Sequence, residues 1–322
     1  MTPKTRGRFA PSPTGPIHLG NARTALLSWL SARAAGGEYL LRVEDLDAPR
    51  VRPGAEARIL AELRWLGLDW DEGPDVGGES GPHRQSERLP RFAAALDHLR
   101  AVGLAYPCFC SRAEVAAAAG APQEPGDEGP RYPGTCRDLS PAEVRARGGR
   151  APSYRFRVPP GVVEFTDGVH GPQRREVEAE VGDFVVTRAD GVPAYQLAVV
   201  VDDAAMGVTE VVRGDDLLAS TARQILLYRA LGAEPPRFAH VPLVVGEDGA
   251  RLAKRHGALT LGELGERGAD PRAVVGLLAA LSGLAPPGER MWPRDLLPGF
   301  SLDQVGRGPA RLAERDALAL LG

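Results

Sequence analysis

The stretch "RFAPSPTGPIHLGN", residues 8–21, places three prolines, two glycines and one histidine within fourteen positions. The chain around it predicts a short strand over 6–12 and a helix over 21–35. The first turn of such a helix offers unpaired N–H groups and a positive dipole end, which together bind phosphate, and His18 lies beside it. Two interpretations stay open from this stretch alone: a phosphate site, or a proline-rich turn with an exposed histidine.

Outward from this turn, the pattern alternates between strands and helices. "EYLLRVEDLD" (38–47) predicts a second strand and residues 54–67 a second helix, an alternation typical of a parallel α/β sheet. Further along, the sequence predicts strands with turns over 153–171 and 181–203, a helix over 220–232, a strand over 240–245 and a mostly helical tail. We therefore expect an α/β fold with an insertion and a short helical C-terminal region.

The composition is that of an ordinary globular protein. The 322 residues are 43% hydrophobic and 25% charged, enough for two domains or for one large domain with insertions. Neither a run of eighteen apolar residues nor a signal peptide is present, so we expect a cytoplasmic protein without a membrane partner. Because the net charge is −3, a nucleic acid could bind only at a local basic face of the protein.

A second basic feature follows the predicted strand over 240–245. "RLAKRHGA" (251–258) carries Arg251 and Lys254 in a loop flanked by glycines, and Lys254 is one of only two lysines in the chain. A cation opposite a helix N-terminus stabilises a phosphoryl group during transfer. The alternative interpretation is a solvated basic loop.

These residues together resemble the class I aminoacyl-tRNA synthetases in their glutamyl form. "APSPTGPIHLGN" resembles the HIGH motif, and "RLAKRHGA" resembles the KMSKS loop with Arg251 for the first lysine and Ala253 for the serine. Residues 194–232 resemble the core of the glutamyl enzymes. The resemblance implies a Rossmann-type parallel sheet and the formation of glutamyl-adenylate from glutamate and ATP, with Mg²⁺. It also implies ATP contacts from His18, Gly20, Asn21, Arg251 and Lys254, of which His18 and Lys254 are catalytic.

The residues also indicate a site for glutamate. Two carboxylates and one ammonium need cations and a counter-anion, and Arg8, Arg213 and Glu44 are the candidates. A buried structural ion pair is the alternative for Glu44 and Arg213. The resemblance adds Phe9, Ala10, Pro11, Ser12 and Tyr195 to the glutamate site. The remaining acids of this region, which we expect to be structural or supporting carboxylates, are Asp202, Asp203, Asp215 and Asp216.

All three cysteines lie in "CFC" (108–110) and "RYPGTC" (131–136). Three thiolates suit tetrahedral Zn²⁺, for which a tyrosine oxygen is an unusual fourth ligand. Three free thiols in a reducing compartment are the alternative. The pattern resembles the zinc site of bacterial glutamyl-tRNA synthetase paralogues that transfer glutamate to the queuosine base of tRNA(Asp). It implies one structural zinc ion held by Cys108, Cys110, Tyr132 and Cys136.

The resemblance also implies an organisation in four parts. We expect the two halves of the catalytic domain at 1–105 and 191–262, an inserted zinc-containing α+β subdomain at 106–190, and a helical region at 263–322. Only 68 residues follow Lys254, too few for the anticodon-binding domain of a glutamyl-tRNA synthetase.

The implied reaction is activation of glutamate without tRNA, followed by transfer to queuosine at the wobble position of tRNA(Asp), with no obligate protein partner. Three alternatives stay open. They are a minimal glutamyl-tRNA synthetase that charges an acceptor end, an adenylate-forming ligase for a small amine, and a non-enzymatic RNA-binding protein.

Overall fold

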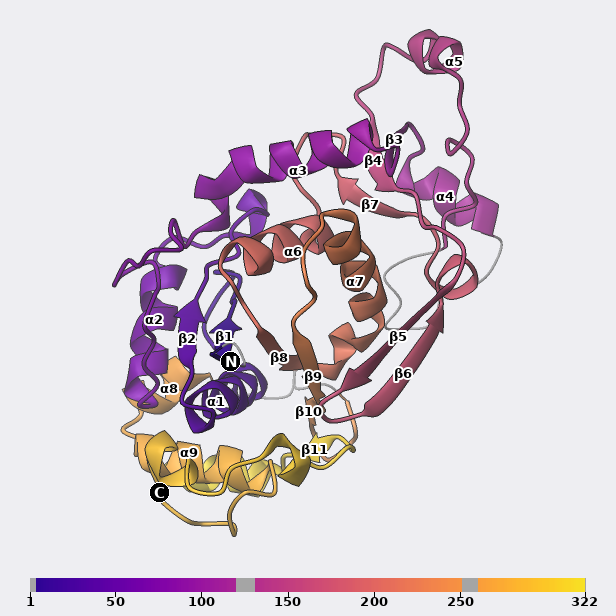
Figure 1. Ribbon diagram of the computed structural model, residues 1–322. Helices are drawn as coiled ribbons and strands as arrows, with labels where there is room; N and C mark the ends of the chain where they lie inside the picture. The colour runs from indigo at the N-terminus through magenta and orange to yellow at the C-terminus, as the bar shows by residue number, and fades with distance from the viewer. Residues whose placement is uncertain (1–3, 120–130, 251–259, 322) are drawn as a thin grey trace.

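The computed structural model describes residues 4–119, 131–250 and 260–321. Its centre is a set of parallel strands in which β1 (Arg6–Phe9) pairs with β2 (Glu38–Leu41) and β8 (Glu210–Gly214) pairs with β9 (Arg237–Val241). The two pairs lie side by side because the Thr209 N–H donates to the Arg6 carbonyl and the Arg6 N–H donates to Thr209 Oγ1 (Figure 1). The predicted parallel α/β sheet is thereby confirmed.

Both N-terminal strands are shorter than predicted. β1 ends at Phe9, two residues before Pro11, because a proline has no N–H to donate to the neighbouring strand. β2 ends at Leu41. Beyond Leu41 the chain still follows its neighbours through single hydrogen bonds, from Arg42 N to the Phe9 carbonyl and from Glu44 N to the Pro11 carbonyl. The predicted extension of the second strand to residue 47 is therefore irregular chain.

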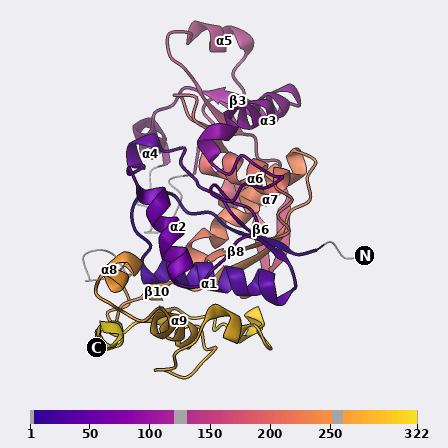
Figure 2. The same ribbon diagram turned by 90° about the vertical axis from the view of Figure 1, so that its left-hand side faces the viewer.

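Helices cover both faces of these strands. α1 (Leu19–Ala34) packs on β1 and β8, with α9 (Pro271–Ala280) beneath it (Figure 2). Leu41 belongs to the apolar core on this side, whereas Leu40 points into a second core. That second core is formed with α3 (Leu89–Ala101), α6 (Tyr195–Ala205) and α7 (Thr221–Ala230).

One predicted strand is a helix. Residues 195–203 were expected to continue the strand pattern, but they form α6. Four consecutive residues of this helix, Leu197 to Val200, are all buried, so the apolar residues show no helical period. A short apolar run that is buried on every side cannot be assigned to helix or strand from periodicity.

The insertion forms a small antiparallel unit at one end of the molecule (Figure 1). Its sheet has the order β3 (Ala105–Cys108), β4 (Ser153–Phe156) and β7 (Phe184–Thr187). A hairpin of β5 (Val162–Asp167) and β6 (Gly171–Glu176) reaches back to β9, where Gly168 N donates to the Phe238 carbonyl. The insertion also contains the helices α4 (Arg112–Ala119) and α5 (Pro141–Ala146) and a π-helical turn at Val177–Val181.

The remaining elements complete the two ends of the chain. α2 (Ala55–Trp65) lies beside α8 (Leu261–Glu266), and α10 (Glu314–Leu318) follows α9 in the tail. The tail contains helices, as predicted, but long stretches between them are turns and irregular chain. It also supplies β11 (Ala310–Arg311), which pairs in parallel with β10 (Val244–Val245). No helix within the described residues is long and apolar enough to cross a membrane. The four domain boundaries given above stay predictions.

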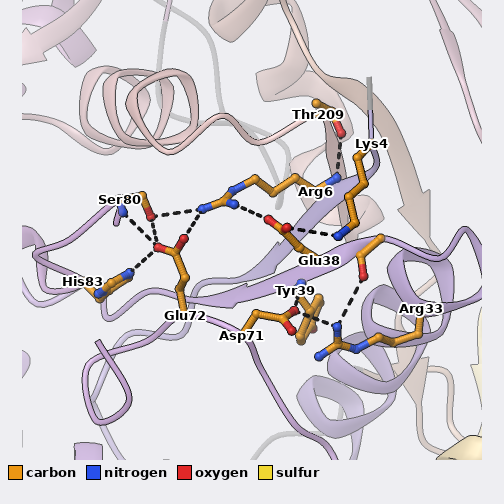
Figure 3. Close-up of polar contacts among 11 residues, drawn as sticks. Lys4, Arg6, Arg33, Glu38, Tyr39, Asp71, Glu72, Ser80, His83 and Thr209 are labelled. Atoms are coloured by element: carbon orange, nitrogen blue, oxygen red, sulfur yellow. Dashed lines mark hydrogen bonds and ion pairs between the residues drawn. The ribbon is translucent and has the colours of Figure 1, made fainter. Parts of the chain in front are cut away.

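Ion pairs close the amino edge of the sheet (Figure 3). Arg6 contacts both Glu38 and Glu72, and Glu72 also accepts hydrogen bonds from Ser80 and His83. Burial raises the pKa of Glu72, but the hydrogen bonds from Ser80 and Arg6 lower it more and hold it at about 2. These side chains fill the amino edge of β1 and β2, and ligands of open α/β sheets bind outside the carboxyl ends of the strands.

Candidate active site

His18 is the N-cap of α1. Its Nδ1 accepts a hydrogen bond from the Asn21 N–H at 3.3 Å, and burial lowers the pKa of the ring. The neutral ring therefore carries its hydrogen on Nε2, which can donate to a phosphoryl oxygen. A Cβ on Gly20 would lie 3.3 Å from the His18 ring, so glycine keeps the first turn of the helix open.

The chain passes beside this helix start a second time. Thr260 forms an antiparallel bridge with His18, and the Leu261 N–H donates to the Ile17 carbonyl. The two predicted phosphate contacts that precede Thr260, Arg251 and Lys254, lie outside the described residues, and their roles stay predictions.

Two buried arginines share one carboxylate at the carboxyl edge. Arg8 Nε donates to both Asp203 oxygens, at 3.3 and 3.4 Å, and Arg42 Nη1 donates to Asp203 Oδ1 at 2.5 Å. Arg42 Nη2 also donates to Glu44 Oε1 at 3.0 Å. Within the described chain, the two terminal nitrogens of Arg8 donate to no hydrogen-bond acceptor. Arg8 therefore keeps donors for a ligand.

Arg213 is buried with neutral partners. Its Nε donates to His240 Nε2 at 2.9 Å, its Nη1 to Gln224 Oε1 at 2.8 Å and its Nη2 to Thr221 Oγ1 at 3.0 Å. None of the described carboxylates forms an ion pair with it, so Glu44 and Arg213 do not pair with each other. Burial lowers the pKa of Arg213, as expected for a cation without a counter-ion.

Two further predicted residues, Tyr195 and Glu44, interact electrostatically with these arginines. Tyr195 is the first residue of α6 and is 39% exposed; partial removal of its hydroxyl from water raises its pKa, and the Arg213 charge opposes the rise. Burial likewise raises the pKa of Glu44, against the charges of Arg42 and Arg8. The structure thus brings Arg8, Glu44, Tyr195 and Arg213 together, beside the backbone of 9–12 that follows β1.

This cluster of charged side chains, the predicted glutamate pocket, holds more positive than negative charge. Its three guanidiniums are those of Arg8, Arg42 and Arg213, and its two carboxylates are those of Asp203 and Glu44. Glutamate, with two carboxylates and one ammonium, carries the opposite net charge and matches this excess. Asp202 lies behind these groups. It binds Arg88 and Gln85 and is 3.8 Å from Arg42 Nε, so Asp202 and Arg88 together add no net charge. Asp215 accepts from the Leu243 N–H.

Sequence reasoning missed Arg42. A charged residue inside the apolar run "YLLRV" was the available signal, because a buried guanidinium requires carboxylate partners.

The four predicted zinc ligands also come together. The sulfur atoms of Cys108, Cys110 and Cys136 lie within 4.8 Å of one another. The Tyr132 hydroxyl oxygen is 3.4 Å from Cys108 Sγ and 3.6 Å from Cys110 Sγ, and it accepts from the Cys136 N–H. This donor set fits one tetrahedral zinc ion.

Two arginines border this cluster. Arg155 Nε donates to Cys108 Sγ at 3.2 Å and its guanidinium lies 3.8 Å from the centre of the Tyr132 ring, while Arg147 Nη1 is 3.7 Å from Cys136 Sγ. Three thiolates around a divalent cation leave excess negative charge, which guanidiniums at this distance offset.

Comparison with known proteins agrees with this geometry. Residues 4–292 match the family described as tRNA synthetases class I (E and Q), catalytic domain. The chain is 58% identical to a glutamyl-Q tRNA(Asp) synthetase of Symbiobacterium thermophilum over 98% of both chains. It is 54% identical to the protein of that name from Nitratidesulfovibrio vulgaris, over 94% of this chain and 91% of that protein.

Among solved structures, a glutamate-tRNA synthetase from Elizabethkingia anophelis superposes with a TM-score of 0.87 at 31% identity. The superposition covers 99% of this chain and 70% of that one. The fold predicted by resemblance is therefore confirmed.

Proposed function

Because the chain belongs to the class I tRNA synthetases of the glutamate and glutamine type, we propose that it activates L-glutamate with ATP, independently of tRNA, and transfers the glutamyl group to the queuosine base at the wobble position of tRNA(Asp). Two relatives named for this activity match the chain along nearly their whole length. One observation carries the glutamate half of the proposal. The three guanidiniums of the site outnumber the carboxylates of Asp203 and Glu44 by one.

The first step needs no side-chain nucleophile. ATP lies over the start of α1, with its phosphates near His18, and an oxygen of the glutamate α-carboxylate attacks the α-phosphorus. A phosphorus–oxygen bond forms, the bond to the β-phosphate oxygen breaks, and pyrophosphate leaves. Catalysis consists of positioning and charge stabilisation by His18 and Lys254. Mg²⁺ bound with ATP neutralises phosphate charge.

The second step transfers the activated group. A hydroxyl of the queuosine cyclopentenediol attacks the carbonyl carbon of glutamyl-adenylate, forms an ester and releases AMP. An anticodon loop can present this hydroxyl because its unstacked bases splay outward and are held by stacking and arginine contacts. The alternative acceptor is the terminal ribose of a tRNA, as in a minimal glutamyl-tRNA synthetase.

Two assays test this function. Glutamate-dependent ATP–pyrophosphate exchange without tRNA tests the first step. Labelled glutamate is then offered to tRNA(Asp) with queuosine, to tRNA(Asp) without it and to tRNA(Glu). We expect label on the first alone, and on the modified nucleoside after nuclease digestion. Label on terminal adenosine, or equal transfer to queuosine-free tRNA, would establish the minimal glutamyl-tRNA synthetase, and absence of exchange without tRNA would exclude the tRNA-independent activation proposed here.

We also propose that Cys108, Cys110, Tyr132 and Cys136 hold one structural zinc ion. Dialysed wild-type protein is expected to carry about one zinc ion per chain, and Cys136→Ser to lose most of it, because the site needs its ligands deprotonated and complete. Elemental analysis measures both, with Thr135→Ser as the matched control. Glutamate activation should change only a few-fold, because a site with four protein ligands has no open position for chemistry. Metal-free wild-type protein would contradict the proposal.

A further inference from the structure

A buried chain of hydrogen bonds leads from the insertion to Arg213. Asp167, the last residue of β5, accepts from His240 Nδ1 at 2.5 Å, and His240 Nε2 accepts from Arg213 Nε at 2.9 Å. The side chains of Asp167 and His240 are fully buried. Neither residue belongs to the proposed glutamate contacts.

The donors and acceptors in this chain fix the state of the histidine. A carboxylate can only accept, so His240 Nδ1 carries the hydrogen, and a guanidinium can only donate, so Nε2 must accept. Both conditions hold only for the neutral ring with its hydrogen on Nδ1. Burial lowers the pKa of His240 to about 4, in agreement with a neutral ring.

We propose that Asp167 and His240 are positioning residues for glutamate recognition: Asp167 fixes the His240 tautomer, and the tautomer supplies the acceptor that holds the Arg213 guanidinium in place. This inference rests on the proposed role of Arg213 in binding glutamate. The other acceptors bind the two terminal nitrogens: Gln224 accepts from Nη1, and Thr221 and the Leu217 carbonyl accept from Nη2. His240 is therefore the acceptor that holds Nε.

Asp167 has a second set of contacts that makes the inference testable. Its Oδ1 accepts three backbone N–H groups, from Val169 at 3.0 Å, His170 at 2.9 Å and His240 at 3.2 Å. In Asp167→Asn the amide oxygen must keep this position, which turns the NH₂ group toward His240 Nδ1. That donor forces the hydrogen onto Nε2, where it faces the Arg213 Nε–H, although Thr221 Oγ1, 3.2 Å from Nε2, can accept part of this hydrogen bond. A donor then opposes a donor, while the shape of residue 167 is preserved.

The expected kinetic result is specific to glutamate. In ATP–pyrophosphate exchange, Asp167→Asn should raise KM for glutamate about 10–100-fold, the scale for a hydrogen bond to a charged group, with little change in kcat or in KM for ATP. The matched control is Asp183→Asn, a buried aspartate of the insertion that bonds Tyr106, Arg137 and the Val158 N–H. It should leave KM for glutamate unchanged.

A double-mutant cycle separates positioning from simple structural support. The Gln side chain in His240→Gln presents a carbonyl oxygen near the former Nε2 and has no tautomer to fix. Adding Asp167→Asn to His240→Gln should therefore raise KM for glutamate only slightly further. If Asp167 were purely structural, Asp167→Asn would raise this KM by the same factor in the wild type and in His240→Gln.

The ring nitrogens report the tautomer directly. Nitrogen-15 NMR of the imidazole should find Nδ1 protonated in the wild type and Nε2 protonated in Asp167→Asn. Three results would overturn the inference. They are an unchanged tautomer in Asp167→Asn, a KM for glutamate within two-fold of wild type, and an equal rise in this KM when Asp167→Asn is made in the wild type and in His240→Gln. The NMR arm requires no substrate, so it decides the tautomer claim even where wild-type exchange fails and the proposed function with it.

Discussion

Arg213→Gln is expected to lower kcat/KM for glutamate in ATP–pyrophosphate exchange about 10³-fold, because removing one member of a buried charge pair costs several kcal/mol of binding. The guanidinium is buried, has no carboxylate partner in the described chain and would meet the glutamate carboxylate directly. Arg213→Lys keeps the charge but loses the planar fork that bonds His240, Gln224 and Thr221, so it should retain part of the activity.

The matched control for this prediction is Arg237→Gln. The Arg237 side chain is 72% exposed and pairs with Glu210 at the opposite end of the sheet, so glutamate kinetics should not change. Activity of Arg213→Gln within ten-fold of wild type would remove Arg213 from the glutamate site.

The second large effect concerns stability. Asp203→Asn removes the carboxylate shared by Arg8 and Arg42, and we expect the free energy of unfolding to fall by about 3–5 kcal/mol, the cost of leaving buried charge unpaired. Urea denaturation measures the change. The control is Asp138→Asn, whose carboxylate is 83% exposed and pairs with Arg157 at the surface. Its loss should cost less than about 1 kcal/mol, and equal costs for the two variants would contradict the prediction.

The same carboxylate gives this stability a pH dependence. Burial raises the pKa of Asp203, but Arg42 and Arg8 lower it more, so the folded-state pKa lies below the unfolded value. Its contribution is therefore complete above the unfolded pKa of about 4 and is lost as the pH falls through the folded pKa. Wild type should lose stability in that acid range more steeply than Asp203→Asn.

The sequence predicted the features that local chemistry determines. The turn at 8–21, the cysteine cluster and the alternation of strands and helices around α1 all depend on residues close together in the chain. α6 was assigned wrongly because its apolar residues are buried on all sides. The contact between Asp167 and His240 had no local signal, because the two residues are 73 positions apart and meet only when the β5–β6 hairpin packs on β9. The roles of the site residues themselves stay predictions.

The charge imbalance of the pocket has a consequence for amino-acid selectivity. In the predicted glutamate pocket three guanidiniums stand against two carboxylates, so one cation has no carboxylate counter-ion among the described side chains. Glutamate supplies it through its side chain, whereas glutamine, nearly identical in shape, brings a neutral amide and leaves the cation uncompensated. We therefore expect the predicted site to distinguish the two amino acids by the charge of their side chains and not by their size.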